Sequence, residues 1–254
     1  MGYRTNEFKN NSFEIGKKNL QYYISTLLKE FKFTHAFFPK VSSEYPIEKL
    51  AYKFNSNKIN YFNKQIHSNN IVLGSKYDQS RRIEADGIIS DKSNQNIWIY
   101  TADCMPILFA DKGSRIVAAA HCGRKGLEKK IIIKILDAMK NLGSQKKNIL
   151  VAIGPSISKE NYLVDEKCLK DFYKKIFNEI DSNQLIDMKN RHKNSKHKYN
   201  LDIREYAYKQ LINNGIIPHH IDISNKCTYK ANSEFFSWRK EKNSKRNWNF
   251  ISSK

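Results

Sequence analysis

The middle of the chain alternates strand-like apolar runs with one long helical repeat, and this alternation constrains the fold more than any other feature. The strand-like runs occupy residues 97–101, 105–110, 115–121 and 148–153. Between the last two, residues 126–141 carry leucine, isoleucine and methionine at helical spacing, and Gly143 stands where a C-terminal cap is expected. Such an alternation favours an α/β or α+β fold with a mixed sheet.

The flanking segments extend this pattern. Further helical repeats cover residues 17–31, 165–177 and 202–214. Residues 34–39 (THAFFP) are typical of a short strand, and residues 221–251 predict strands joined by turns. A length of 254 residues suits one α/β domain. We therefore expect a single domain over 1–254, with a mixed β-sheet core, flanking helices, and residues 1–33 as a helical lead-in.

The charge is strongly basic but scattered. Lysine and arginine number 45 against 25 aspartate and glutamate, a formal net charge of +20. The densest basic run, residues 189–198 (KNRHKNSKHK), is typical of a solvated loop, so we do not expect nucleic acid as a partner. No apolar run approaches the roughly 18 residues of a membrane helix, and the first residues do not resemble a signal peptide. We expect a soluble, cytoplasmic protein with no membrane partner.

Four cysteines occur, and no two of them form a short-spaced pair. They are Cys104, Cys122, Cys168 and Cys227. Disulfides are not favoured in a cytoplasmic chain of this size, so each cysteine is either a buried apolar residue or part of a reactive site.

Three residues that can do chemistry follow or end apolar segments. Cys104 lies between two strand-like runs, His121 ends the run RIVAAAH, and His67 lies in the sequence QIHS. Two imidazoles and one thiolate form a three-ligand set suited to catalytic zinc, with water in the fourth position. The same donors also accept copper. The sequence therefore offers a metal site, although its ligands are widely spaced.

A second reading uses two of the same residues. Cys104 is also a candidate nucleophile with His121 as its general base, as in many hydrolases. Asp103 would then orient the base or hydrogen-bond to the backbone. Spacing alone does not separate this arrangement from metal ligation.

Several other polar residues are candidates for binding. Arg239 and Arg246 can grip phosphate or carboxylate in a bidentate manner, or form surface ion pairs. Tyr162 can stack on a base or fill the core. Lys125 is a further cation, and Asp86 before Gly87 is an ordinary turn signal.

A set of motifs, in one order, resembles the YfiH family, also called the multicopper polyphenol oxidase or laccase-domain family, to which the human protein FAMIN belongs. The resemblance covers roughly residues 34–251. The motifs are QIH (65–67), ADGIIS (85–90), TADCMPI (101–107), AAHCG (119–123), IGPSI (153–157) and FFS (235–237).

The resemblance implies a fold similar to that of the catalytic domain of cytotoxic necrotising factor. It implies a zinc ion held by His67, Cys104 and His121, with copper possible. It further implies purine nucleoside phosphorylase activity on adenosine, inosine and methylthioadenosine, together with adenosine deaminase activity. The partners would be a purine nucleoside and phosphate, with Lys125, Arg239 and Tyr162 as substrate-binding candidates. Copper polyphenol oxidation and peptidoglycan editing are the family's other labels.

The chain departs from the family pattern at two places. The family's H-x-G-W-R-G is HCGRKG here, so Arg124 replaces tryptophan and Lys125 replaces arginine. Lysine lacks the planar fork of arginine, so this position would hold phosphate less well. Cys122 is a possible extra soft ligand. The family's N-terminal motif H-G-F-S-T-R-x-G-G-V-S is reduced to HAFFPK at residues 35–40. These departures leave open that this chain is a family member that keeps the metal site and has lost catalysis.

Overall fold

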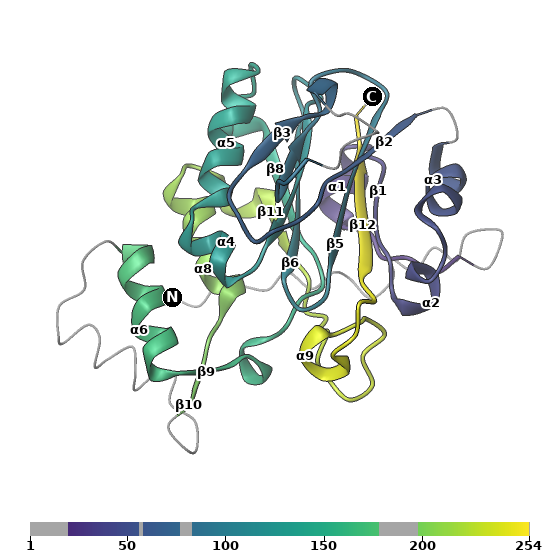
Figure 1. Cartoon of the computed structure of the whole chain (residues 1–254). Coiled ribbons are helices and arrows are strands. Elements are labelled where there is room, and N and C mark those ends of the chain that lie inside the picture. Colours follow the sequence, from purple (N-terminus) through teal and green to yellow (C-terminus); the bar gives the residue numbers. More distant parts are fainter. Residues whose placement is uncertain (1–19, 56–57, 77–82, 178–197, 254) are drawn as a thin grey trace.

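The computed structural model describes residues 20–55, 58–76, 83–177 and 198–253. Two packed sheets lie between helices (Figure 1). The larger sheet has six strands in the order β11 (Ile221–Ile223), β8 (Ile149–Ile153), β6 (Met105–Asp111), β7 (Val117–Cys122), β4 (Gly87–Ile89) and β3 (Ile71–Leu73). The smaller has four, in the order β1 (His35–Phe37), β12 (Asn247–Ser252), β5 (Gln95–Thr101) and β2 (Ile59–Phe62). Both sheets mix parallel and antiparallel pairs, which confirms the expected mixed architecture.

Helices cover the outer faces of both sheets. One group covers the larger sheet: α4 (Arg124–Glu128), α5 (Ile131–Asn141), α6 (Glu166–Phe177) and α8 (Ile203–Asn213). On the other side α2 (Lys40–Ser43) and α3 (Ile47–Asn55) pack beside the smaller sheet. The remaining elements are α1 (Thr26–Glu30), α9 (Trp238–Glu241), and a ribbon of β9 (Leu163–Asp165) and β10 (Lys198–Asn200).

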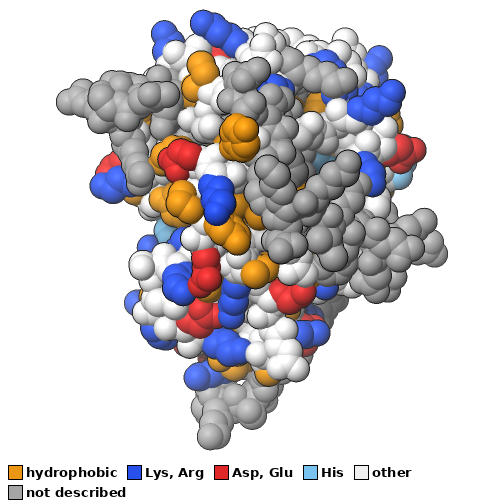
Figure 2. Space-filling model, turned by 90° about the vertical axis from the view of Figure 1, so that its right-hand side faces the viewer, with side chains coloured by type: hydrophobic (Ala, Val, Ile, Leu, Met, Phe, Trp, Pro, Cys, Tyr) orange, Lys and Arg blue, Asp and Glu red, His pale blue; other side chains and the backbone are white. Residues whose placement is uncertain are grey.

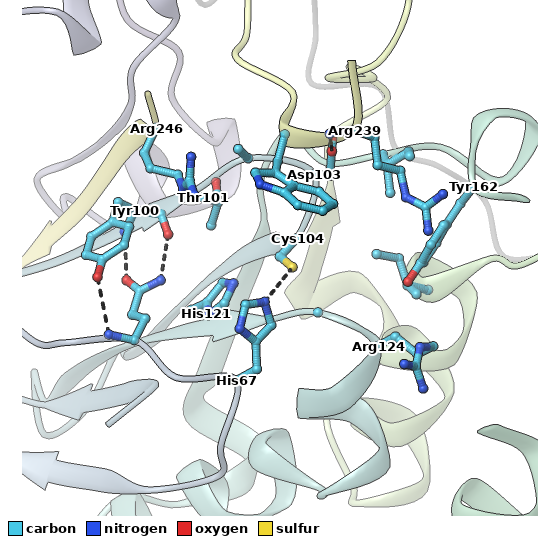
Figure 3. A pocket seen from close by; sticks show the side chains of 16 residues that line it. His67, Tyr100, Thr101, Asp103, Cys104, His121, Arg124, Tyr162, Arg239 and Arg246 are labelled. Atoms are coloured by element: carbon cyan, nitrogen blue, oxygen red, sulfur yellow. Dashed lines mark hydrogen bonds between the residues drawn. The ribbon is translucent and has the colours of Figure 1, made fainter. Parts of the chain in front are cut away.

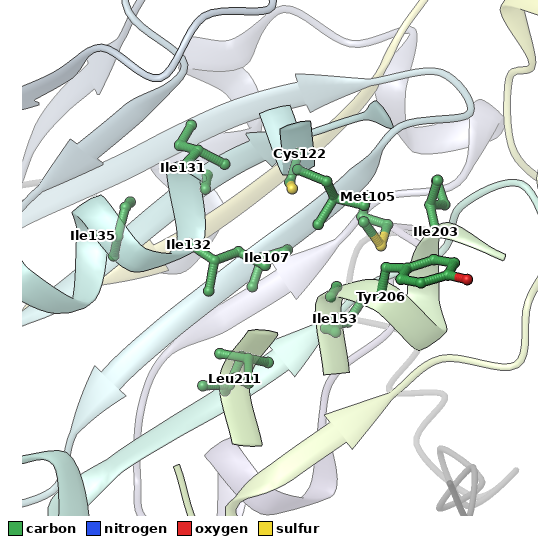
Figure 4. Packing of buried hydrophobic residues seen from close by; sticks show 14 of the residues in the cluster. Met105, Ile107, Cys122, Ile131, Ile132, Ile135, Ile153, Ile203, Tyr206 and Leu211 are labelled. Carbon is green, nitrogen blue, oxygen red and sulfur yellow. The ribbon is translucent and has the colours of Figure 1, made fainter. Parts of the chain in front are cut away.

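Strand alternation divides the core into layers. In β6, Met105, Ile107 and Phe109 pack against the helices, whereas Leu108 and Ala110 point toward the smaller sheet. Figure 4 shows the helix-side layer, with residues of α5 and α8 against β6 and β8. Because both faces of β6 are buried, its sequence is a continuous apolar run.

The central elements agree with the sequence prediction, with one break. The four strand-like runs correspond to β5, β6, β7 and β8, and the last two predicted helices to α6 and α8. The predicted helix 126–141 is instead split into α4 and α5. Lys130 has a left-handed backbone (φ +60°) and stands at the N-terminus of α5, which turns the chain between the two helices.

The helical lead-in is wrong where the structure describes it, from residue 20 onward; residues 1–19 lie outside the described part. Only Thr26–Glu30 is helical. Tyr23 forms an antiparallel bridge to Phe37, and its side chain joins the layer between the sheets, while Tyr22 and Ile24 join the outer layer. This alternation requires an extended chain, so tertiary packing overrides the helical spacing of Leu20 and Ile24.

Charge is dispersed on one face of the molecule. On the face drawn in Figure 2, basic side chains of the described residues lie among acidic and neutral ones rather than in one stripe. No described helix has the length and apolar character needed to cross a bilayer. All four cysteines are free thiols.

A close approach at Gly154 provides a test of the packing. A Cβ at Gly154 would overlap the ring of Phe37 and lie 2.7 Å from Cγ of Pro106. We expect Gly154→Ala to lower the free energy of unfolding by about 1–3 kcal/mol, measured by urea denaturation. Gly126→Ala is the matched control, because its Cβ would meet Ile131 at an ordinary 3.4 Å; alanine inside α4 should be neutral or slightly stabilising. Equal effects of the two substitutions would contradict this packing.

Candidate metal centre and adjoining cavity

The structure brings His67, Cys104 and His121 together, although 54 positions separate the first from the last. One ligand atom from each lies within 4.8 Å of the others, and the Cys104 Sγ is 3.8 Å from the His67 Nε2 (Figure 3). Cys104 directly precedes β6, and His121 lies near the end of β7, where it pairs with Pro106. His67 comes from the loop between β2 and β3.

Two residues at this site have a left-handed backbone. His67 has φ +56° and Asp103 has φ +85°. Non-glycine residues in this region cost on the order of 1–3 kcal/mol each, and they persist only where the surroundings hold them. Gly123 adds a close approach, since a Cβ there would overlap the Cys104 Sγ.

Asp86 holds the loop that carries His67. Its carboxylate accepts hydrogen bonds from the backbone N–H groups of Ile66 (3.2 Å), His67 (3.0 Å) and Ser68 (2.6 Å), and from the Ser68 hydroxyl. The same carboxylate lies 2.8 Å from the His121 Nδ1. Asp86 is therefore more than a turn residue, because one buried carboxylate orients two of the three candidate ligands.

A second side chain fixes the same loop from the other side. Gln65 donates from Nε2 to the Tyr100 carbonyl (2.6 Å) and accepts from the Tyr100 N–H at 2.9 Å. The side chain of Gln65 therefore pairs with the backbone of β5 as a neighbouring strand would, as the dashed lines beside Tyr100 show (Figure 3).

Electrostatics favour charged forms at the centre. Burial by itself raises the pKa of the Asp86 carboxyl, but hydrogen bonds from His121 and Ser68 outweigh it and lower that pKa to about 2. Burial likewise raises the pKa of the Cys104 thiol, and the nearby His121 and His67 outweigh it, which lowers this pKa to about 6. The charges of Cys104 and Asp86 raise the pKa of His121 above its usual range, against the effect of burial.

The donor set fits a divalent metal ion. With bond lengths of about 2.0–2.3 Å, two ligands of a tetrahedral ion lie about 3.5 Å apart, close to the 3.8 Å between Cys104 and His67. Because Asp86 engages Nδ1 of His121, Nε2 remains available to an ion, the usual carboxylate–histidine arrangement. The group can therefore hold a metal ion.

A cavity of about 340 Å³ adjoins these ligands. The residues that line it include aromatic and cationic side chains: Tyr100, Arg124, Tyr162, Trp238, Arg239 and Arg246. This volume lies within the range of about 300–1,000 Å³ that small-molecule pockets occupy. The candidate ligands and these side chains therefore face one space.

Asp103 joins the walls of the cavity rather than orienting His121. Its carboxylate accepts hydrogen bonds from the Thr228 hydroxyl (2.7 Å) and the Arg239 N–H (2.8 Å). Its carbonyl accepts from Ile157 at 2.9 Å. Of the two roles expected for Asp103, the structure supports hydrogen bonding to the backbone, and Asp86 is the residue that orients the imidazole.

The other candidate residues divide into two groups. Tyr162, Arg239 and Arg246 line the cavity, whereas Lys125 is exposed and is not among its lining residues. Its neighbour Arg124 lines the cavity instead. Cys122 is fully buried on the helix side of β7 and is not a ligand candidate, because strand alternation points it away from His121.

Sequence reasoning gave no role to Gln65, although it begins the QIH motif, and it did not single out Tyr100 or Trp238. Trp238 lines the cavity and is 50% exposed. The only sequence feature that pointed to a functional role for Trp238 is its position between the FFS motif and Arg239. Tyr100 falls inside a strand-like run, where an aromatic residue is typical of core.

A sequence profile of the family described as "Multi-copper polyphenol oxidoreductase laccase" matches residues 43–254. The chain belongs to this family. A relative in Synechocystis, named purine nucleoside phosphorylase, is 31% identical over 235 residues, covering 86% of this chain and 87% of the relative. A Clostridium acetobutylicum protein of the same name is 31% identical over 209 residues and 81% of both chains. The resemblance seen in the motifs is thus confirmed.

Two solved structures have the same fold. Bacillus licheniformis YfiH superposes with a TM-score of 0.77 at 22% identity, covering 96% of this chain and all of that one. YlmD from Geobacillus stearothermophilus gives 0.77 at 19% identity, covering 96% and 99%.

Asp86 offers a test of how the site is held. We expect Asp86→Asn to weaken zinc binding about 10- to 100-fold, because His121 loses its charged partner and the His67 loop loses an acceptor. A competition titration with a chromophoric chelator measures this. Asp91→Asn is the control: Asp91 also accepts hydrogen bonds from a backbone N–H, that of Ser75, and from a side chain, that of Gln95. Equal zinc affinities of the two variants would rule out the orienting role of Asp86.

Proposed function

We propose that this chain is a zinc-dependent purine nucleoside phosphorylase acting on adenosine, inosine and methylthioadenosine, with adenosine deaminase activity. The supporting observation is that His67, Cys104 and His121 line the same cavity as aromatic and cationic side chains. Relatives covering most of the chain carry the name purine nucleoside phosphorylase, which supports the same reaction class here.

Phosphorolysis places clear demands on a site. An oxygen of inorganic phosphate attacks C1′ of the ribose while the C1′–N9 bond breaks, and its electron pair leaves with the purine, which takes up a proton. The transition state resembles an oxocarbenium ion. The site therefore needs a cation for phosphate, a surface for the base, and a group that stabilises the departing purine.

Arg239 is the best-placed residue for inorganic phosphate. Asp103 holds its backbone, its guanidinium lies 4.4 Å from the centre of the Tyr162 ring, and Nη1 donates to the Leu163 carbonyl. Arg124 is less suited, because it forms an ion pair with Glu128. Lys125 and Arg239 were both candidates for binding phosphate. Because Lys125 is exposed and does not line the cavity, we assign phosphate binding to Arg239. Trp238 and Tyr162 supply aromatic surface for the base.

Zinc is the ion we propose for the centre, because two imidazoles and one thiolate are among its preferred ligands. When bound, it would supply Lewis-acid chemistry beside the substrate. In deamination, water adds to C6 of adenosine and ammonia leaves, giving inosine. Copper, which the family's description suggests, is the alternative ion for the same donors and would accompany polyphenol oxidation.

Products test this function directly. Zinc-loaded protein with adenosine and phosphate should release adenine and ribose 1-phosphate, and without phosphate it should release inosine and ammonia, as chromatography would show. We expect His121→Ala to reduce both rates at least about 100-fold, since losing a ligand costs more than losing its hydrogen-bond partner. His219→Ala is the control, because His219 is an exposed histidine outside the cavity lining. Full turnover in His121→Ala, or no product from wild type, would refute the proposal.

A second candidate function rests on the thiol itself. Two histidines beside Cys104 and the lowered pKa of its thiol also suit a nucleophile with His121 as base. The activity would be hydrolysis of an amide, including bonds met in peptidoglycan editing.

Protection of Cys104 by zinc separates these candidates. We expect iodoacetamide to label Cys104 in metal-free protein and zinc to suppress that labelling, because a metal-bound thiolate is a poor free nucleophile. Cys168, partly exposed and outside the ligand group, serves as the internal control whose labelling zinc should leave unchanged. Peptide mass spectrometry reports both sites. Labelling of Cys104 at full rate with stoichiometric zinc present would favour the amide hydrolase.

A further inference from the structure

Cations stand on two opposite sides of the cavity. Figure 3 shows Tyr100 and Arg246 on one side of His67 and Cys104, and Arg124, Tyr162 and Arg239 on the other. Inorganic phosphate bound at Arg239 would occupy only one of these two sides. The cation on the other side, Arg246, is therefore free to bind a second anion.

Arg246 is placed to receive a ligand. Its Nη1 donates to the carbonyls of Asn243 (2.9 Å) and Lys245 (2.8 Å), which lie in its own loop. Among the described residues, no carboxylate forms an ion pair with it. Arg246 is half-buried, directly before β12. The guanidinium is thus anchored at one nitrogen, and none of the described carboxylates neutralises its charge.

The space beside Arg246 continues into a second hollow. This outer hollow, of about 510 Å³, shares Tyr100 and Arg246 with the inner cavity. Its other lining residues are Ser43, Glu44, Phe236, Ser244, Lys245 and Trp248. Lys245 is paired with Glu44 at 2.7 Å, so Arg246 supplies the net positive charge among the side chains lining the hollow. A group that extends past Arg246 therefore has room and hydroxyl partners.

The chemistry of the reaction suggests what this group is. In a β-nucleoside the base and the 5′ carbon lie on one face of the ribose, and the attacking phosphate approaches C1′ from the opposite face. A substrate with a 5′-phosphate would thus present a second anion on the other side of the sugar. Arginine binds phosphate through parallel N–H donors. On each side of this cavity lies an arginine, Arg239 or Arg246, that forms no ion pair with a carboxylate in the part of the chain that the structure describes.

We propose that Tyr100, Arg246 and the outer hollow form a subsite for the 5′-phosphate of a purine nucleoside 5′-monophosphate. This inference rests on the proposed function, since the nucleoside part would occupy the inner cavity. Arg246 is then a specificity-determining residue that adds affinity for a 5′-phosphate to the nucleoside binding proposed above, while Arg239 serves inorganic phosphate.

Calorimetric binding to the zinc-loaded protein tests the subsite without requiring turnover. Adenosine and adenosine 5′-monophosphate are titrated in the presence of excess inorganic phosphate, so that the inner phosphate position is filled. We expect the monophosphate to bind at least about tenfold more tightly than adenosine. Arg246→Gln should bring this ratio close to one, Arg246→Lys should leave an intermediate ratio, and Arg239→Gln should preserve the ratio while weakening inorganic phosphate.

Each alternative outcome has a definite meaning. Equal wild-type affinities, or a preference that Arg239→Gln removes and Arg246→Gln keeps, would overturn the subsite while leaving phosphorolysis of adenosine intact. Tight monophosphate binding that depends on Arg246, without any phosphorolysis, would support the subsite and defeat the proposed function. Binding of neither compound would overturn both. Circular dichroism of Arg246→Gln and Arg246→Lys checks that both variants are folded.

Discussion

The carboxylate of Asp86 is the interaction on which the site depends. It is almost completely buried, yet it accepts hydrogen bonds from three consecutive residues of the His67 loop and lies 2.8 Å from His121. Burying a carboxylate costs free energy unless its oxygens are satisfied, and here the satisfying donors are the groups that the site must position. The same bonds support the left-handed backbone of His67. The same hydrogen bonds therefore compensate the buried charge of Asp86 and orient the candidate ligands His67 and His121.

Asp103 has the corresponding role for the walls of the cavity. Residues 102–104 cross from β5 in the smaller sheet to β6 in the larger one. At this crossing the Asp103 carboxylate holds Thr228 and the start of α9, so that Arg239 faces the same space as Cys104. Two adjacent residues therefore serve different parts of the site: Cys104 belongs to the candidate ligand group, and Asp103 fixes the cavity wall that carries Arg239.

The sequence predicted the three central strands β6, β7 and β8 of the larger sheet, because β6 and β8 are buried on both faces and their sequences are continuous apolar runs. It did not predict the three-residue strands β3 and β4 of the same sheet. It failed for residues 20–24, where alternate side chains enter different layers, and at Lys130, where neither glycine nor proline marks the break between α4 and α5. The spacing of His67, Cys104 and His121 left their convergence open, and only the family motifs joined them. Asp86 was undervalued because an Asp-Gly pair is an ordinary turn signal, and its bonds form with residues 18 to 35 positions away.

The placement of the candidate ligands also explains why the centre and the cavity belong together. His67 lies where the chain passes from β2 in the smaller sheet to β3 in the larger, Cys104 lies at the crossing from β5 to β6, and His121 belongs to the larger sheet itself. An ion held by all three would therefore tie both crossings to β7. The apolar layers already fix how the sheets pack, so the binding energy of the ion would act mainly on the two loops. These loops also carry Gln65 and Asp103, which fix Tyr100 and Arg239, so the segments that hold two of the candidate ligands also position two walls of the cavity.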